Sequence, residues 1–214
     1  MELHFSFVVP VYNRPGETRE LLESLAGQKG SIPFEVVIVE DGSQKTSAAE
    51  VEAFRDRLDL AYFQKNNTGP GDSRNYGMQR ASGNYFILVD SDCIIPTGYM
   101  ESVMNALSER YVDCFGGPDD AHPSFNALQH AISYTMTSLL TTGGVRGKRI
   151  SSTDFQPRSF NMGISREAFL ASGGFGNIHP GEDPDLSLRL KQQGFALGFI
   201  PGATVYHKRR INFR

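Results

Sequence analysis

Apolar and polar residues alternate along the first half of the chain in a pattern that predicts strands separated by helices. Short apolar runs rich in β-branched and aromatic residues predict strands at residues 5–11, 34–39, 60–63 and 85–89. Segments with helical spacing of apolar residues predict helices at residues 16–28, 47–58, 70–80 and 98–110. This alternating order is typical of α/β proteins, so we expect a mostly parallel sheet flanked by helices.

The second half of the chain is less regular. Its pattern predicts short strands at residues 112–115, 160–164, 196–200 and 204–207, and helices at residues 124–140, 166–171 and 183–193. Residues 141–156 have no convincing periodicity and combine glycines with Arg146, Lys148 and Arg149. We expect this segment to be a mobile loop that helps to close over a ligand, because loops of this length are usually functional.

The composition indicates a globular protein of one domain. The chain has 214 residues, of which 39% are hydrophobic, and its 21 basic and 24 acidic residues give a net charge of −3. This near balance leaves no basic field, so no nucleic-acid partner is expected. Cys93 and Cys114 lack a CxxC spacing and lie in or beside expected strands. We interpret them as reduced core residues of a cytosolic protein, with a single disulfide as the alternative.

The two ends of the sequence bear on its location. Residues 1–4 lack the basic and apolar segments of a signal peptide, and no apolar run has the length of a membrane span. We therefore expect a cytoplasmic protein. The sequence ends on the basic segment 208–214, and such charge is typical of cytoplasmic loops near membranes. We expect a natural C-terminal extension that associates with the inner face of the membrane; a frayed polar tail is the alternative.

The triplet Asp90-Ser91-Asp92 directly follows the apolar run 85–89 and is the most informative motif of the chain. The carboxyl ends of buried strands border the crevice in which open α/β sheets bind ligands. Strand residues two apart project the same way, so both carboxylates can face one hard cation or one polar ligand. Two like charges are costly there unless a cation or hydrogen-bond donors compensate them. The alternative is a solvated loop in which Asp92 only caps the next segment.

Two polar segments follow the first two expected strands. Residues 10–14 (Pro-Val-Tyr-Asn-Arg) have none of the glycines that a dinucleotide-binding turn requires, which disfavours NAD and FAD. Residues 40–43 (Glu-Asp-Gly-Ser) offer carboxylates that can accept hydrogen bonds from a base N–H group or a ribose hydroxyl. An Asp-Gly turn without any ligand is the alternative for the second segment.

Two more polar segments lie at expected helix starts. Residues 67–74 contain Gly69 and Gly71, where the backbone can approach a ligand closely, and Arg74 one turn into the helix. The Lys-Ser/Thr pair of a Walker A loop is missing. Residues 181–185 (Gly-Glu-Asp-Pro-Asp) open another helix. One acid suffices to cap a helix, so three acids in four residues indicate a further role.

Five motifs occur in a fixed order along the chain. They are residues 8–13 (VVPVYN), 39–43 (VEDGS), 69–75, 90–92 (DSD) and 181–186 (GEDPDL). Each is weak alone, but together and at this spacing they resemble the family 2, GT-A type glycosyltransferases, from Phe5 to about His207. The resemblance implies the GT-A fold, an α/β fold with a mostly parallel, Rossmann-like sheet flanked by helices and an acceptor-side extension.

The resemblance implies one domain over residues 1–214. Residues 1–117 would form the half that binds the nucleotide sugar, and residues 118–214 the half that binds the acceptor and carries the catalytic base. The implied reaction is inverting transfer from a nucleotide-diphosphate sugar, preferably a UDP-sugar, to a saccharide or lipid-linked acceptor in polysaccharide or glycolipid synthesis. Mn²⁺ or Mg²⁺ would assist, because departure of a nucleoside diphosphate leaves negative charge that a cation neutralises.

The resemblance also implies roles for single residues. The metal ligands would be Asp92 and His207, and Asp90 would bind through water or to the ribose. The nucleotide would be bound by Pro10, Val11, Tyr12, Asp41, Gly71, Arg74, Asp90 and Ser91, with Asp41 reading the base. Asp183 would take the proton of the acceptor hydroxyl, and Glu182 would bind the acceptor or support the site, unless these two roles are exchanged. A lone histidine after a strand is also common on surfaces and in cores, which is the alternative for His207.

Two other classes of protein share part of this pattern. An Asp-x-Asp motif after an apolar strand is also found in haloacid-dehalogenase-type phosphatases, but there it follows the first strand and precedes Thr or Val. Here three strand–helix units precede the motif and Cys93-Ile94 follows it. A non-catalytic module that binds sugar nucleotides is the second alternative, and the presence of both Asp92 and Asp183 argues against it.

Overall fold

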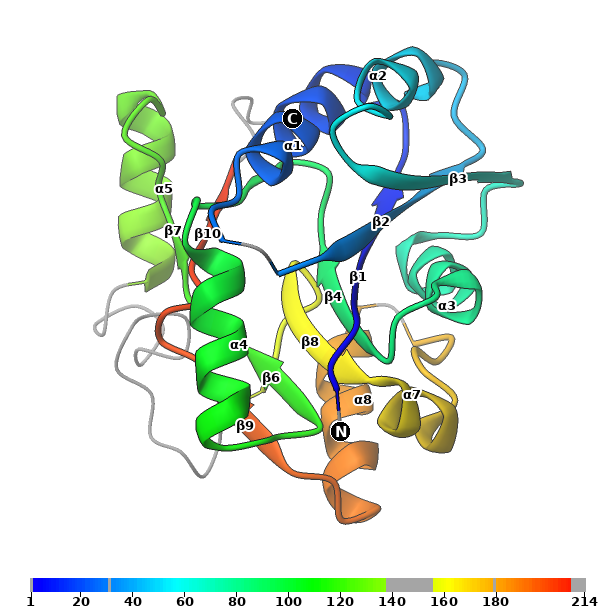
Figure 1. Cartoon of the computed structure of the whole chain (residues 1–214), viewed down its shortest axis with the longest axis vertical. Helices are drawn as coiled ribbons and strands as arrows, with labels where there is room; N and C mark the ends of the chain where they lie inside the picture. The colour runs from blue at the N-terminus through cyan, green and yellow to red at the C-terminus, as the bar shows by residue number, and fades with distance from the viewer. Residues whose placement is uncertain (1, 31, 138–155, 179, 209–214) are drawn as a thin grey trace.

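A computed structural model of the chain describes residues 2–30, 32–137, 156–178 and 180–208 (Figure 1). Its first strands are β1 (Phe5–Val11), β2 (Phe34–Asp41), β3 (Asp59–Lys65) and β4 (Tyr85–Val89). The helices between and after them are α1 (Pro15–Ala26), α2 (Ala48–Ala53), α3 (Pro70–Arg80) and α4 (Tyr99–Glu109). These four strands are parallel and lie in the order β3-β2-β1-β4, so the predicted α/β architecture is confirmed.

The second half of the chain extends the sheet with shorter elements. It adds the strands β6 (Cys114–Gly116), β8 (Asn161–Ser165) and β9 (Leu197–Phe199), and the helices α5 (Ala127–Thr137), α7 (Arg166–Ser172) and α8 (Glu182–Gln192). Strand β8 runs antiparallel to both β4 and β6. The seven-stranded sheet, in the order β3-β2-β1-β4-β8-β6-β9, is therefore mixed but mostly parallel.

A small second sheet lies beside the large one. It contains β5 (Cys93–Ile94), β10 (Val205–His207) and β7 (Asp119–Asp120), in the spatial order β5-β10-β7. Its central strand, β10, pairs antiparallel with β5, which places His207 opposite Cys93. The second sheet therefore brings the far end of the described chain back to the segment that follows β4.

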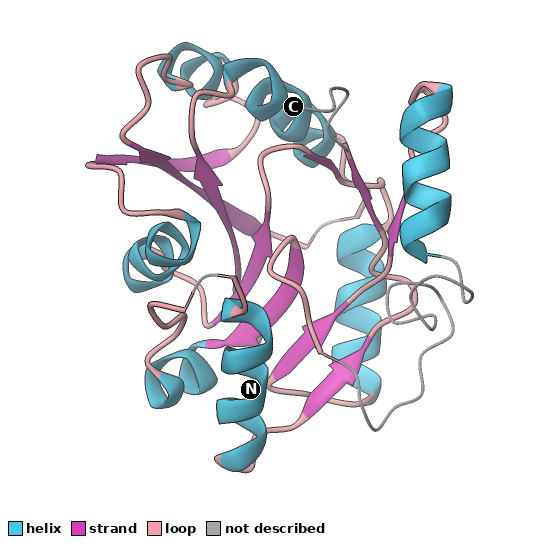
Figure 2. Ribbon diagram, turned by 180° about the vertical axis from the view of Figure 1, so that it is seen from behind, coloured by secondary structure: helices cyan, strands magenta, loops and turns pink. Residues whose placement is uncertain are grey.

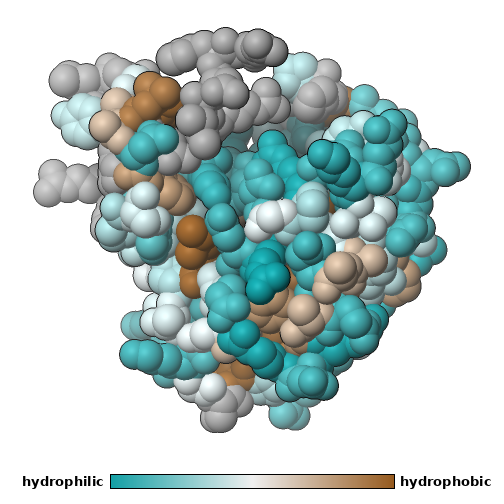
Figure 3. Space-filling model, turned by 90° about the horizontal axis from the view of Figure 1, so that it is seen from above, coloured by the Kyte–Doolittle hydropathy of each residue, from teal (hydrophilic) through white to brown (hydrophobic). Residues whose placement is uncertain are grey.

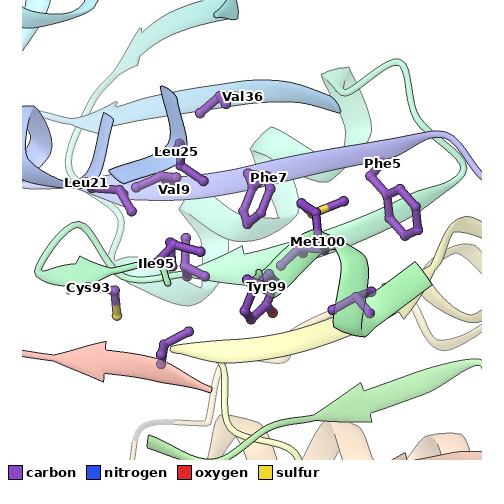
Figure 4. Close-up of a cluster of buried hydrophobic side chains, with 14 of the residues drawn as sticks. Phe5, Phe7, Val9, Leu21, Leu25, Val36, Cys93, Ile95, Tyr99 and Met100 are labelled. Atoms are coloured by element: carbon purple, nitrogen blue, oxygen red, sulfur yellow. The ribbon is translucent and has the colours of Figure 1, made fainter. Parts of the chain in front are cut away.

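Helices cover both faces of the large sheet (Figure 2). On one face, side chains of α1, α2 and α4 pack on alternate residues of the strands, such as Phe7 and Val9. Figure 4 shows this core, in which the ring of Phe7 lies 6.1 Å from that of Tyr99 on α4. On the other face, α3, α7 and α8 pack on the intervening residues, such as Val8 and Leu88. Burial on both faces explains why these strands are almost uninterrupted apolar runs.

Several elements differ from the sequence prediction. Helix α2 ends at Ala53, and residues 54–58 continue as turns. These turns contain hydrogen bonds from an amide to the carbonyl three residues earlier, such as that from Arg57 to Phe54. The pattern continued further because Phe54 stays buried in these turns. Strands β5 and β7 were not predicted, since two residues are too short to show a period. The expected helix at 124–140 is observed as α5, and the expected loop at 141–156 lies outside the described residues except Gln156.

Two smaller expectations can be compared with the fold. Cys93 and Cys114 are free thiols and both are buried, as expected of core residues. Among the described helices, none is long and apolar enough to cross a membrane.

The close packing of α3 on the sheet depends on Gly77. A β-carbon at this position would lie 2.4 Å from Cγ1 of Val8 and 3.1 Å from Cγ2 of Val39. We expect Gly77→Ala to lower the free energy of unfolding by about 1–3 kcal/mol, because overpacking outweighs the gain in helix propensity. Urea unfolding followed by circular dichroism measures this loss. Gly16→Ala in α1 is the matched control, since a β-carbon there meets nothing within 4 Å; equal stability of the two variants would contradict the prediction.

Candidate active site

A cleft of about 660 Å³ opens at the carboxyl ends of β1, β2 and β4. Strands β1, β2 and β4 run upward in Figure 1, so this edge faces the viewer in Figure 3, where the surface is mainly hydrophilic. The cleft is also lined by the starts of α3 and α8, and by the residues at and after the end of β10. It therefore lies where parallel α/β sheets bind their ligands.

The Asp90-Ser91-Asp92 triplet forms a turn at the end of β4. The Cys93 amide donates a hydrogen bond of 3.1 Å to the Asp90 carbonyl, and β5 begins directly afterwards. The two carboxylates therefore lie in a turn and do not project from one extended strand, which corrects the strand geometry expected for this triplet. Asp90 pairs with Arg74, whereas Asp92 pairs with Arg14 and His207.

Asp92 is held between two basic side chains. Its Oδ2 atom accepts a hydrogen bond of 2.5 Å from Nη1 of Arg14, and its Oδ1 atom lies 3.1 Å from Nε2 of His207. Burial opposes ionisation of Asp92, but the hydrogen bond with His207 and the charge of Arg14 outweigh it and lower the pKa of Asp92. Asp92 is therefore an anion over the whole neutral range of pH.

The same pair of residues fits a divalent cation. A carboxylate oxygen of Asp92, in the turn before β5, and the imidazole nitrogen of His207, on β10, converge, and both side chains are ligands that Mn²⁺ accepts. The ring of His207 is held by stacking at 5.0 Å on Phe160. The nearby thiol of Cys93 is a poor ligand, because burial raises the pKa of Cys93 well above its usual value and keeps the thiol protonated.

Arg74 links the Asp90 end of the cleft to the start of α8. Its Nη2 atom donates a hydrogen bond of 2.6 Å to Asp90, and its Nη1 atom lies 3.9 Å from Oε1 of Glu182. The side chain of Arg74 is 4% exposed, and its guanidinium carbon lies 5.6 Å from the ring centre of Phe175. Its Nε and Nη1 atoms have no hydrogen-bond partner among the described residues. The N–H groups on Nε and Nη1 can therefore donate hydrogen bonds to an anionic ligand in the cleft.

Asp41 ends β2 and is nearly buried. Its Oδ1 atom accepts hydrogen bonds from Nζ of Lys65 (2.6 Å) and the Thr68 amide (2.9 Å), and its Oδ2 atom accepts one from the Gly69 amide (2.9 Å). These bonds fix the carboxylate against the loop before α3. Each carboxylate oxygen has two acceptor sites, so Oδ2 retains one that can serve a ligand.

Asp183 and Glu182 open α8 but point to different surroundings. Glu182 lines the cleft. The Oδ2 atom of Asp183 accepts a hydrogen bond of 3.1 Å from the amide of Ser159, and its Oδ1 atom is buried without a hydrogen-bond partner in the described part of the chain. Burial raises the pKa of Asp183, and the hydrogen bond from Ser159 and the charge of Arg74 offset this only in part. Asp183 is therefore a better proton acceptor near neutral pH than an ordinary aspartate.

Comparison with known proteins identifies the family. The model of the family described as Glycosyl transferase family 2 matches residues 6–170. The chain belongs to glycosyl transferase family 2. The resemblance inferred from the five sequence motifs is thereby confirmed. The phosphatase alternative loses its support, because the acidic motif of this chain follows the fourth strand and not the first.

Two relatives illustrate how this family 2 chain matches larger proteins. Poly(ribitol-phosphate) β-N-acetylglucosaminyltransferase TarS of Staphylococcus aureus is 35% identical over 114 residues, which cover 52% of this chain and 20% of TarS. Hyaluronan synthase of Pasteurella multocida is 24% identical over 235 residues, covering 95% of this chain and 24% of the synthase. The chain thus spans about a fifth to a quarter of the length of these relatives.

Solved structures confirm the fold. The structure of residues 1–349 of S. aureus TarS in complex with UDP-GlcNAc superposes with a TM-score of 0.74 at 23% identity, covering 98% of this chain and 60% of that one. The mannosyltransferase PcManGT of Pyrobaculum calidifontis, in complex with GDP-Man and Mn²⁺, gives a TM-score of 0.75 at 16% identity, covering 99% and 59%. At such low identity these matches show the shared α/β fold of GT-A glycosyltransferases and no more.

Most of the predicted site residues of this family 2 chain line the cleft. They are Pro10, Val11, Tyr12, Asp41, Arg74, Asp90, Ser91, Asp92, Glu182 and His207. Gly71 and Asp183 are not among the lining residues. Gly71 lies against Phe175, because a β-carbon at Gly71 would be 3.3 Å from the side chain of Phe175. The glycine of this loop that lines the cleft is Gly69, with a φ of 96° that favours glycine.

Sequence reasoning missed several lining residues. Arg14, Asn67, Pro70, Ser159 and Lys208 also border the cleft. Arg14, Asn67 and Pro70 lie within the polar segments 10–14 and 67–74, so the position of these segments after strands was an available signal. Ser159 and Lys208 carried no such signal, because the second sheet and the turn before β8 bring them to the cleft.

A second cavity, of about 690 Å³, lies on the other side of β10. Tyr206 lines this cavity and its neighbour His207 lines the cleft, as expected of successive strand residues. Among the charged groups at its rim, Lys208 forms an ion pair of 2.7 Å with Glu20, and Glu23 forms one of 3.0 Å with Arg57. Nothing at this cavity identifies a ligand.

The buried charge of Asp183 should reduce the stability of the fold. The pKa of the Asp183 carboxyl group is higher in the folded state than in the unfolded state. The contribution of this group to stability is therefore fully present below its unfolded-state pKa and is lost as the pH rises through its folded-state pKa. At pH 7.5 we expect Asp183→Asn to raise the melting temperature by about 2–4 °C, which corresponds to ~1 kcal/mol for a domain of this size. The difference should shrink at pH 4, as measured by thermal unfolding.

Asp185→Asn is the matched control for this prediction. Asp185 lies in the same helical turn but forms an ion pair of 2.8 Å with Arg189. Its substitution should lower the melting temperature at pH 7.5, because an ion pair is lost. A melting temperature of Asp183→Asn that falls as much as that of Asp185→Asn would show that the Asp183 charge is stabilising, against our prediction.

Proposed function

We propose that this domain is an inverting glycosyltransferase that moves a sugar from a nucleotide-diphosphate sugar to an acceptor hydroxyl. The observation that carries the proposal is the arrangement of the cleft. Asp92 and His207, which fit a cation, lie at the end of β4, and the acidic start of α8 lies across Arg74 from Asp90. A departing diphosphate can therefore be stabilised at one end of the cleft, and an acceptor proton can be removed at the start of α8, where Glu182 lines the cleft and the proposed base Asp183 is the next residue.

The donor is proposed to be a UDP-sugar. Asp41 at the end of β2 and the residues 10–12 at the end of β1 line the same part of the sheet edge, and an anchored carboxylate can accept a hydrogen bond from the imide N–H of uracil. The structure of the relative TarS holds UDP-GlcNAc, which supports this choice. N-acetylglucosamine is accordingly the first sugar to test.

Mn²⁺ or Mg²⁺ is proposed as the cofactor, held by Asp92 and His207. When bound, such a cation would supply positive charge for the diphosphate as the bond to the sugar breaks. Arg74 would bind the donor near Asp90 with the donors that it retains. The presence of Mn²⁺ in the structure of the mannosyltransferase PcManGT supports a cation in this fold.

Asp183 is proposed as the base that receives the proton of the acceptor hydroxyl. The raised pKa of Asp183 increases its proton affinity near neutral pH, and the hydrogen bond from the Ser159 amide fixes its position. Glu182 is proposed to orient the acceptor or Arg74. The names of the relatives, a poly(ribitol-phosphate) N-acetylglucosaminyltransferase, a hyaluronan synthase and a chondroitin synthase, favour a polymeric acceptor in polysaccharide synthesis.

Loss of the Asp41 carboxylate should weaken nucleotide binding. We expect Asp41→Ala to reduce the affinity for UDP by roughly 5- to 100-fold, because a buried hydrogen bond to the base is lost. Calorimetric titration of UDP in the presence of Mn²⁺ measures the effect. Thermal unfolding of the variant without ligand is the control for its structural role, since Asp41 also anchors Lys65 and the loop before α3. An unchanged affinity for UDP would exclude Asp41 from base recognition.

The catalytic assignment rests on a comparison of two adjacent carboxylates. We expect Asp183→Asn to leave UDP binding intact and to reduce sugar transfer by roughly 10²-fold or more, because the amide has no basicity. Release of UDP from UDP-GlcNAc, with and without a saccharide acceptor, measures the reaction. Near-normal transfer by Asp183→Asn together with an inactive Glu182→Gln would identify Glu182 as the base. Full transfer by both variants would show that neither carboxylate is the base, and binding of UDP without transfer by the original chain would favour the non-catalytic module.

A further inference from the structure

Arg14 places a positive charge at the carboxylate that is proposed to bind the metal. The turn between β1 and α1 positions it, and Asn13 in this turn has a φ of 56°. The Asn13 amide donates to the hydroxyl of Ser43 at 2.8 Å, and its side-chain oxygen accepts from the amides of Gln44 and Lys45. These bonds tie the turn to the loop after β2, so the backbone at Arg14 is fixed.

The side chain of Arg14 is less constrained than its backbone. The Arg14 carbonyl accepts hydrogen bonds from the amide and the hydroxyl of Thr18, at 3.0 and 2.8 Å, in the first turn of α1. The side chain of Arg14 remains 34% exposed and borders the cleft. Among the described residues, the guanidinium donates one hydrogen bond, to Asp92, which is 78 positions away in the sequence. It can therefore turn toward another anion in the same cleft without disturbing the helix.

We propose that Arg14 and the divalent cation compete for Asp92, and that Arg14 binds the donor's diphosphate once it leaves this carboxylate. The inference rests on the proposed donor function. A cation at Asp92 would bring two positive charges next to a guanidinium that is 2.5 Å from the same carboxylate, and this repulsion is costly in a partly buried site. A diphosphate relieves it, because its oxygens match the planar fork of arginine.

This exchange couples the two ligands of the site. Without nucleotide, binding of the metal must break the Arg14–Asp92 ion pair, so the metal binds weakly. With the diphosphate present, Arg14 has a new partner and Asp92 is released for the metal. If the diphosphate strengthens metal binding by a given factor, linkage requires that the metal strengthen nucleotide binding by the same factor. Arg14 thus favours the joint presence of metal and nucleotide over either alone.

The variant Arg14→Gln tests the exchange through binding rather than activity. Manganese paramagnetic resonance gives the affinity for Mn²⁺ without nucleotide, and calorimetry gives the affinity for UDP with and without Mn²⁺. We expect Arg14→Gln to bind Mn²⁺ alone roughly 3- to 10-fold more tightly, and the strengthening of UDP binding by Mn²⁺ to fall by a similar factor. Arg14→Lys, which keeps the charge, should lie between Arg14→Gln and the original chain.

Arg19→Gln is the matched control, because it removes the same charge from an exposed position on α1, the helix that begins directly after Arg14, and Arg19 lies outside the cleft. It should leave both affinities unchanged. If UDP binding by the original chain is independent of Mn²⁺, the proposed metal-assisted donor site fails and the exchange fails with it. If the original chain shows the coupling and both Arg14 variants retain it in full, the donor site stands and the role of Arg14 is refuted.

Discussion

Repulsion between acidic side chains is the constraint on which the arrangement of the cleft depends. Five carboxylates, from Asp41, Asp90, Asp92, Glu182 and Asp183, gather at or near one edge of the sheet. Ionised carboxylates that share a partly buried site raise one another's energy unless opposite charges or donors are close. Lys65 contacts Asp41, Arg74 contacts Asp90, and Arg14 contacts Asp92. Asp183 has no cation in direct contact among the described residues, and it is the carboxylate whose pKa is raised.

The compensating cations are positioned by packing elsewhere in the fold. Arg74 reaches Asp90 because α3 lies close against β1 and β2, and this close approach depends on Gly77 one turn further along the helix. Arg14 reaches Asp92 because the Asn13 turn redirects the chain immediately after β1. Small changes in backbone packing at Gly77 or Asn13 would therefore displace the cations that pair with Asp90 and Asp92, while the pairing of the strands stayed the same.

The large elements and the main motifs followed from the sequence for a clear physical reason. Strands β1, β2 and β4 are buried on both faces, so their apolar runs are almost uninterrupted, and polar residues directly after them mark the sheet edge. Strands β5 and β7 could not be predicted, because two-residue strands exist only through the pairing with β10. The same holds for the contacts of the site. The Arg14–Asp92 pair and the Asp183–Ser159 hydrogen bond join residues from different elements, and no local pattern encodes such pairs.

The position of β10 has a consequence for the order in which the site is assembled. The first four strands with their helices bury most of one core, and they are the part of a chain that leaves the ribosome first. His207 reaches Asp92 only when β10 pairs with β5, and the next residue, Lys208, bonds to Glu20 across 188 positions. Contacts of such high sequence separation form late in folding, because their loop-closure entropy is large. A nascent chain can therefore hold a folded first half of the sheet while Asp92 and His207, the pair proposed to bind a cation, have not yet come together.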